Sequence, residues 1–179
     1  ALMDHTTKGV ASCIQLRGEY VFVAEGKGGF RAYDAASVAN KGYGQRVITA
    51  PFSPLGHDTH VASKNATCMA LPTNQPINPE KIQGDLMRIT NMEQPFHPIS
   101  NYAFITDSEE GLIAVNVNTL ADGEPRNNFF ERAVSWNENG VLSGASHITL
   151  GGHYAYITTP KGLVFVDINN PLKPRHITT

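Results

Sequence analysis

The chain repeats one short pattern three times, and this repeat constrains its fold more than any other feature. The three copies are GEYVFVAEGKGGFRAYD at residues 18–34, SNYAFITDSEEGLIAVN at 100–116 and GGHYAYITTPKGLVFVD at 151–167. Each copy has a tyrosine near its start, then a short apolar run, a turn that ends in glycine, and a second apolar run that closes with Asp or Asn. Because the copies share this order of features, each is expected to form the same supersecondary unit.

The apolar runs predict β-strands. The runs at 21–24, 103–106 and 155–158 are rich in β-branched and aromatic residues, and they are apolar at both alternating sets of positions. They are too short for helices, and strands of this kind are usually covered on both faces of their sheet. The glycines that end the turns, Gly29, Gly111 and Gly162, are expected to need a positive φ.

Two further strands complete each unit. Residues 9–16, 65–71 and 144–150 precede the tyrosines, and residues 46–50, 131–136 and 175–179 are candidate fourth strands. Four short antiparallel strands without an intervening helix are typical of a β-propeller blade, which must stack on its neighbours to bury its faces. We therefore expect an all-β fold and a single partial β-propeller domain over 1–179. Its blade-like units lie at about 9–50, 65–136 and 144–179, with an insertion at 72–98.

The repeat resembles the LVIVD-repeat family of β-propellers. The third copy, GHYAYITTPKGLVFVDINNPLKP at 152–174, resembles the family's blade pattern most closely. The first copy lacks both prolines of that pattern, and the second has Asn116 where the pattern has Asp. The resemblance implies an exported protein in the periplasm, outside the cell or on the cell surface. Members are often associated with cytochrome-bearing polypeptides, but this chain has no Cys-x-x-Cys-His motif, so any haem is expected on another segment or subunit.

Three blades are too few for a closed ring, because propellers typically close with about four to eight blades. The sequence favours a segment of a larger propeller. Assembly of several copies and further blades hidden in the irregular segments are the alternatives.

The charge balance argues against nucleic acid as a partner. The formal net charge is −2, so there is no excess of Lys and Arg to bind phosphates. No apolar run is long enough to span a membrane, so direct membrane insertion is not expected. The expected partner is another protein or the remaining blades of the same polypeptide.

Cys13, Cys68 and His147 occupy one equivalent position in the three units. If this position faces the central channel, three potential metal or redox ligands line it at one height. Cysteine also serves as a compact apolar filler, and plain packing is the favoured interpretation. The two cysteines could also form one disulfide, which the sequence leaves open.

Two irregular segments interrupt the repeat and carry the remaining candidate residues. Residues 72–98 contain five prolines, and residues 51–64 contain His57 and His60. A His-x-x-His pair can chelate a metal, and His147 is the speculative third ligand. The acidic turn at 107–110 is expected to be a solvated hairpin tip.

No catalytic motif is found: the chain has no Gly-x-Ser-x-Gly, His-Glu-x-x-His or phosphate-binding loop. The favoured function is a non-catalytic scaffold or binding module that contacts its partner through the loops at 72–98 and 51–64, with no cofactor within the chain. The rival is an enzyme or redox-associated protein with a channel-centred metal. A self-assembling structural unit is the third possibility.

Overall fold

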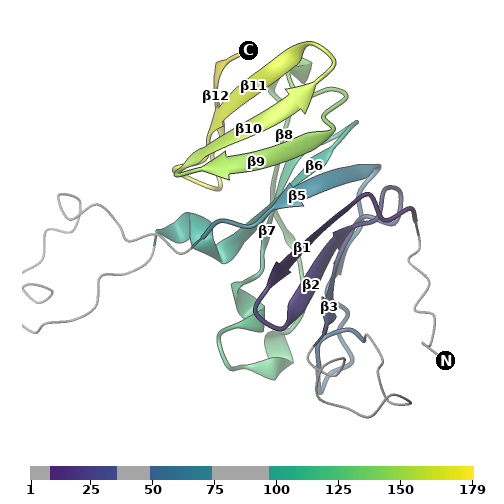
Figure 1. The fold of residues 1–179 in the computed structure, drawn as a ribbon. Helices are drawn as coiled ribbons and strands as arrows, with labels where there is room; N and C mark the ends of the chain where they lie inside the picture. The colour runs from purple at the N-terminus through teal and green to yellow at the C-terminus, as the bar shows by residue number, and fades with distance from the viewer. Residues whose placement is uncertain (1–8, 36–48, 74–96) are drawn as a thin grey trace, which may run out of the picture.

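The computed structural model describes residues 9–35, 49–73 and 97–179, which form three four-stranded antiparallel sheets (Figure 1). The first sheet contains β1 (Cys13–Arg17), β2 (Tyr20–Ala24), β3 (Phe30–Asp34) and β4 (His60–Val61). The second contains β5 (Ala66–Ala70), β6 (Tyr102–Asp107), β7 (Gly111–Asn116) and β8 (Arg132–Trp136). The third contains β9 (His147–Gly151), β10 (Tyr154–Thr159), β11 (Gly162–Asp167) and β12 (Arg175–Thr178). The predicted all-β fold of four-stranded, blade-like sheets is confirmed.

Only short 3-10 helices interrupt the strands in these residues. They are η3 (Pro98–Asn101), η4 (Asn118–Leu120), η5 (Pro125–Asn127) and η6 (Glu138–Gly140). No helix in the described ranges has the length and apolar character needed to cross a membrane.

The three sheets have the same internal register, so the repeat seen in the sequence is a repeat in space. The tyrosine that opens each second strand pairs with the last residue of the third strand: Tyr20 with Asp34, Tyr102 with Asn116, and Tyr154 with Asp167. The Cys or His position in each first strand pairs with the fifth residue of the second strand: Cys13 with Ala24, Cys68 with Thr106, and His147 with Thr158. Residues can therefore be compared across the sheets position by position.

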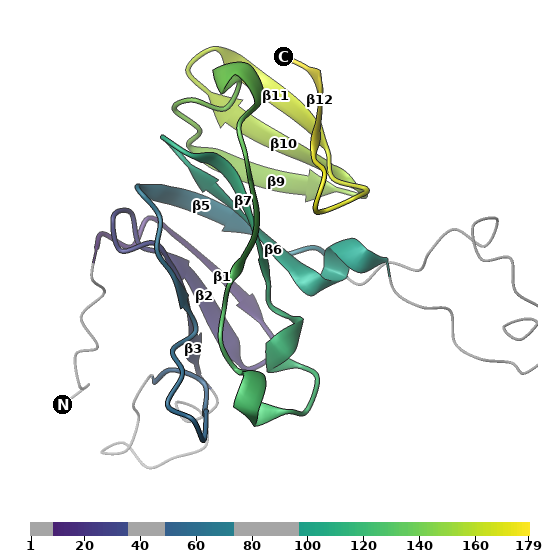
Figure 2. The same cartoon turned by 180° about the vertical axis from the view of Figure 1, so that it is seen from behind.

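The sheets stack face to face as a fan, with their first strands β1, β5 and β9 side by side and their outer strands spread apart (Figures 1 and 2). Within the described residues the fan does not close into a ring. This arrangement explains why strands of the middle sheet are apolar on both faces, since each face has a neighbour.

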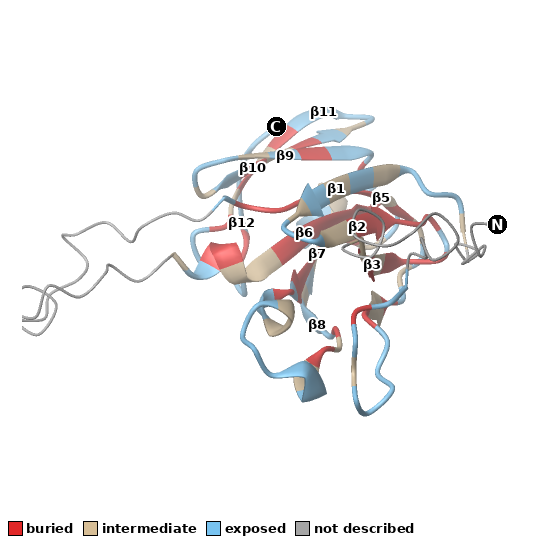
Figure 3. Cartoon of the chain, turned by 60° about the horizontal axis from the view of Figure 1, so that its bottom comes forward, coloured by how far each residue is buried: buried red, intermediate tan, exposed pale blue. Residues whose placement is uncertain are grey.

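Two apolar cores lie between the sheets. The first joins Phe22 and Phe30 of the first sheet to Ile105 and Ile113 of the second, and the ring of Phe130 stacks on both phenylalanines. The second core joins the opposite face of the second sheet to the third sheet. Its members include Phe104, Leu112, Ala114, Ile157, Val164 and Val166. The middle sheet thus contributes to both cores. Buried residues along its strands β6 and β7 are coloured red in Figure 3.

The first sheet differs from the sequence expectation at its fourth strand. The predicted strand at 46–50 lies largely outside the described residues, and Thr49 forms only an isolated bridge with Asp34. The described fourth strand is β4, where His60 and Val61 pair with Arg31 and Phe30. The first unit therefore extends beyond residue 50. Most of the predicted insertion, residues 74–96, also lies outside the described residues.

Positive φ at the turn glycines is confirmed, with values of 82° at Gly29, 89° at Gly111 and 133° at Gly162. At Gly111 a second constraint acts, because an added Cβ would lie 2.7 Å from the Trp136 carbonyl oxygen. The backbone that leaves β8 approaches so closely that only a residue without a side chain fits.

The acidic turn after β6 is not a solvated hairpin tip, and this expectation was wrong. Asp107 is fully buried, and its Oδ1 accepts hydrogen bonds from the N–H groups of Glu109 at 2.8 Å and Glu110 at 2.9 Å. Its Oδ2 accepts from the N–H of Asn65 at 2.6 Å. The carboxylate holds the turn together and ties it to the segment that enters β5, so its oxygens are occupied by the protein itself.

Candidate functional site

The long connections of the three sheets lie at one end of their strands. In a sheet whose strands are ordered first to fourth, the first-to-second connection and the third-to-fourth connection both lie at the same end of the strands. We call this end of the fan the loop rim. Its described segments are 18–19, 49–59, 71–73, 97–101, 117–131, 152–153 and 168–174. The described parts of both irregular segments identified in the sequence therefore meet at one rim.

A cavity of about 360 Å³ lies between the first strands β1, β5 and β9. Cys13, Cys68 and His147 all line it, together with residues 71–73 and Gly152 at the loop-rim end. We call this space the inner cavity. Equivalent positions on three neighbouring first strands thus face one common space, and the described start of the 72–98 segment lines one end of it.

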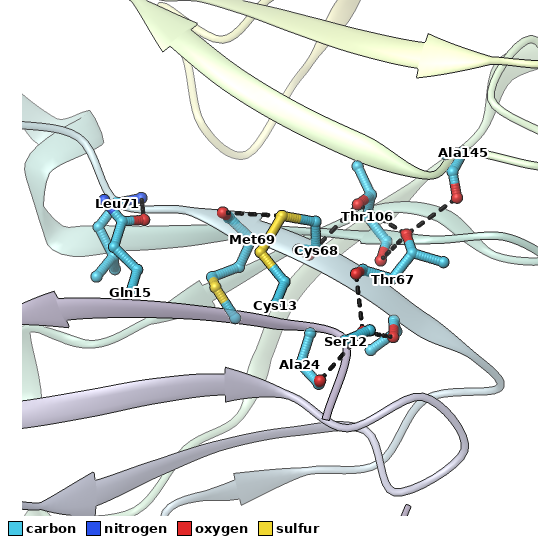
Figure 4. Close-up of a disulfide and its surroundings, with 11 residues drawn as sticks. Ser12, Cys13, Gln15, Ala24, Thr67, Cys68, Met69, Leu71, Thr106 and Ala145 are labelled. Carbon is cyan, nitrogen blue, oxygen red and sulfur yellow. Dashed lines mark hydrogen bonds between the residues drawn. A yellow bond between two sulfur atoms is a disulfide. The ribbon is translucent and has the colours of Figure 1, made fainter. Parts of the chain in front are cut away.

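Cys13 and Cys68 form a disulfide across the first and second sheets (Figure 4). Their Cα atoms are 4.8 Å apart, within the usual range for disulfides, because equivalent residues of adjacent first strands lie directly beside each other. Plain packing of free cysteines, the favoured sequence interpretation, is therefore corrected. The disulfide also removes both sulfurs as thiolate ligands of a metal.

Further bonds join the first two strands beside the disulfide. The Leu71 N–H donates to Gln15 Oε1 at 3.0 Å, and Ser12 Oγ lies 2.8 Å from the Thr67 carbonyl oxygen (Figure 4). The wall of the inner cavity between β1 and β5 is therefore fixed by one covalent bond and several polar contacts.

The three histidines proposed as metal ligands lie on different elements. His147 is exposed on β9, at the inner cavity. His60 lies on β4, the outermost strand of the first sheet, where its Nε2 is 2.7 Å from the Gly28 carbonyl oxygen. His57 lies on the loop rim against the ring of Phe129, with centroids 5.2 Å apart. Within the described residues no three His, Cys, Asp or Glu side chains are grouped so that they could hold a metal ion.

The described loop at 51–59 is ordered by contacts with the second sheet's connection. The Asn128 side-chain amide donates to the Phe52 carbonyl oxygen at 2.6 Å, and His57 packs on Phe129. The same loop exposes two large apolar side chains, with Phe52 at 71% and Leu55 at 64% exposure. A loop held in place by its neighbours thus presents Phe52 and Leu55 to solvent.

Sequence reasoning missed a buried polar group at the start of the first hairpin turn. Glu25 is fully buried, accepts a hydrogen bond from the Tyr33 hydroxyl at 2.5 Å and lies 3.6 Å from Arg31 Nε. Burial, followed by the hydrogen bond to Glu25, raises the pKa of Tyr33. Arg31 also binds Asp58 of the loop rim at 2.5 Å. The available signal in the sequence was the position itself, since Glu25 and Asp107 both lie five residues after the tyrosine of their repeat.

Four-stranded antiparallel sheets that fan out from a central cavity lined by their first strands define this chain as a β-propeller module. Within that class, the LVIVD repeat family matches residues 8–34 and 144–177, so the chain carries LVIVD repeats in these two regions. These are the first and third units, and the structure adds the second sheet, which has the same register. No curated protein and no solved structure matches the chain.

Proposed function

We propose that this β-propeller module is a non-catalytic scaffold or binding module of an exported or surface protein, and that its partner is another protein held at the loop rim. The single observation that carries the proposal is the ordered loop with Phe52 and Leu55 exposed. Exposed apolar side chains at a loop tip are typical of protein contact sites. Because the loop is already held by Asn128 and Phe129, little conformational entropy is lost when a partner binds.

The Cys13–Cys68 disulfide supports an oxidising location. Disulfides persist in the periplasm, outside the cell and on cell surfaces, and they are rare in reducing compartments. An exported protein that presents a binding loop on a disulfide-linked scaffold is consistent with both observations.

A variant pair tests the binding role. We expect a column that carries the immobilised wild-type chain to retain the partner protein, and a column that carries Phe52→Ser/Leu55→Ser to release it. The double substitution removes the apolar contact area, while the backbone contacts that hold the loop remain. Val10→Ser is the matched control, since Val10 is 80% exposed but precedes β1 at the end opposite the loop rim. The bound proteins are identified and quantified by mass spectrometry. An identical set bound to the double variant would contradict the proposal.

Metal analysis tests the rival function on the same preparation. A stoichiometric metal in the purified chain that is lost in His147→Ala would support a metal-dependent activity at the inner cavity and would count against a purely non-catalytic role.

A further inference from the structure

The 3-10 helix η3 contacts all three sheets at the loop rim. In Figure 1 it is the teal helix that directly precedes β6. Its residue Asn101 accepts a hydrogen bond at the carbonyl oxygen from the N–H of Val117, which follows β7 of the second sheet, at 2.8 Å. The guanidinium of Arg17, at the end of β1, donates to the Ser100 carbonyl oxygen at 3.2 Å. The link to the third sheet is made by His97, the residue that caps the helix.

Hydrogen bonds on both ring nitrogens of His97 fix its protonation state. Its Nδ1 lies 3.2 Å from the backbone nitrogen of Ile99, and a backbone N–H can only donate. Nδ1 therefore carries no proton. The proton of the neutral ring is then on Nε2, which lies 3.0 Å from the side-chain oxygen of Asn169, in the connection between β11 and β12. The observed geometry needs the neutral imidazole in this one tautomer.

The bond to Nδ1 holds a residue of the core in place. Ile99 is fully buried, and its side chain packs in the core between the second and third sheets. A buried N–H that loses its acceptor costs free energy, so the observed position of Ile99 depends on the ring of His97.

The charged groups of the neighbouring elements do not compensate a positive charge on His97. None of the ion pairs formed by the described residues includes His97. From the first sheet, the nearest charged contact of η3 is the cation Arg17. In the third sheet, the carboxylate of Asp167 binds Arg175 at 2.9 Å and also interacts with His153. Protonation of His97 therefore adds a charge that has no carboxylate partner.

We propose that His97 is a pH-sensitive link between η3 and the third sheet. Histidine ordinarily changes its charge between about pH 5 and 8, and both ring nitrogens of the protonated form carry a hydrogen. Nδ1 then cannot accept from the Ile99 N–H, so the start of η3 moves and the bond to Asn169 is lost with it. The link is therefore present at neutral pH and is lost as the pH falls. The core between the sheets and the contact of Thr67 with the Ala145 carbonyl oxygen remain, which confines the change to the loop rim.

Amide hydrogen exchange of the full chain, followed by NMR, tests the proposal. Between about pH 7.5 and about pH 5.5, we expect the protection factor of the Ile99 N–H to fall about 10-fold, because one hydrogen bond is lost. The protection factor already corrects for the intrinsic pH dependence of exchange. The N–H of Gly144, which donates to the Ser108 carbonyl oxygen at the opposite end of the fan, is the internal control and should keep its protection.

A pair of variants assigns the effect to His97. His97→Asn keeps a side-chain oxygen that can accept from the Ile99 N–H, as asparagine commonly does when it caps a helix, but it does not titrate. The protection of Ile99 should therefore be independent of pH in this variant. His176→Asn, at an exposed histidine of β12, is the matched control and should keep the pH dependence of the wild-type chain.

The nitrogen chemical shifts of the His97 ring provide a test that needs no variant. In the wild-type chain at about pH 7.5, Nδ1 should be unprotonated and Nε2 protonated. A proton on Nδ1 at this pH would overturn the proposal, as would equal protection of Ile99 at the two pH values. The same loss of protection in His97→Asn would also overturn it. These measurements need no partner at the loop rim, so their outcome is independent of the proposed function.

Discussion

At the scale of single residues, the buried carboxylate of Asp107 stabilises the hairpin turn between β6 and β7. Asp107 receives three backbone N–H groups, and two of them belong to its own turn. Burial alone would raise the pKa of Asp107, but the hydrogen bonds from Asn65, Glu110 and Glu109 lower it below its ordinary value. The acidic sequence of the turn therefore reflects structure rather than a surface charge.

This lowered pKa predicts how the contribution of Asp107 depends on pH. The folded-state pKa lies below the unfolded value of about 3.9, so stabilisation is complete above that value and is lost as the pH falls through the folded-state pKa. Asp107→Asn should therefore cost about 1–3 kcal/mol of unfolding free energy at about pH 7 and less at about pH 2. Urea denaturation at both pH values measures the difference. Exposed Glu109→Gln is the control, and an effect of Asp107→Asn that does not change with pH would contradict the assignment.

At the scale of elements, the hairpin between the second and third strands depends on a glycine for two separate reasons. Gly111 has a φ of 89°, and an added Cβ would lie 2.6 Å from Asn137 Cβ. The first constraint comes from the turn itself and can be read from the sequence. The second is a tertiary contact: the backbone at the end of the fourth strand, which is distant in the sequence, lies directly against the turn.

A pair of alanine substitutions separates these two constraints. Gly123 has a φ of 79° but open space around it, so Gly123→Ala should cost only about 1 kcal/mol for the left-handed conformation. Gly111→Ala should cost about 3 kcal/mol or more, because β8 must also shift. Equal losses of unfolding free energy in urea titrations would show that the close approach has no energetic effect.

At the scale of the whole molecule, stability depends on junctions between sheets. The middle sheet contributes its two faces to two cores, and the disulfide adds a covalent link between the first and second sheets. The linked residues are 55 positions apart, so the disulfide closes a long loop in the unfolded chain. Restricting the unfolded chain in this way favours the folded state.

Removal of the disulfide should therefore destabilise the whole fan. Cys13→Ala/Cys68→Ala is expected to lose about 2–4 kcal/mol of unfolding free energy. Reductant should lower the melting temperature of the wild-type chain but not that of the double variant, with both measured at one protein concentration. An equal response of the two proteins to reductant would argue against a stabilising bond between these cysteines.

Much of the fold could be predicted from the sequence, but less of the candidate site. The tyrosines and turn glycines identified the strands and their register because these depend on local geometry. The sequence also showed that Cys13, Cys68 and His147 are equivalent. It could not show that Cys13 and Cys68 form a disulfide. Equivalence in the repeat gives the position of a residue along its strand, but it does not give the residue of the neighbouring sheet that this residue contacts. Two other contacts could not be predicted for the same reason. The hydrogen bond between Tyr33 and Glu25 lies inside the folded first sheet, and the bond from Asn128 to the loop of Phe52 joins segments far apart in the sequence.

By itself the amino-acid sequence determined the repeated four-stranded unit, because alternation of side chains along a strand and positive φ at a turn are properties of a few neighbouring residues. Only the tertiary structure decided which of the equivalent positions in the repeat are buried and which are exposed. Met69 is buried while Ile14 is exposed, and Leu112 is buried while Leu163 is exposed, although each pair occupies one place in the repeat. The difference arises because burial depends on whether another sheet lies against that face, and this is set by stacking between sheets rather than by the local sequence.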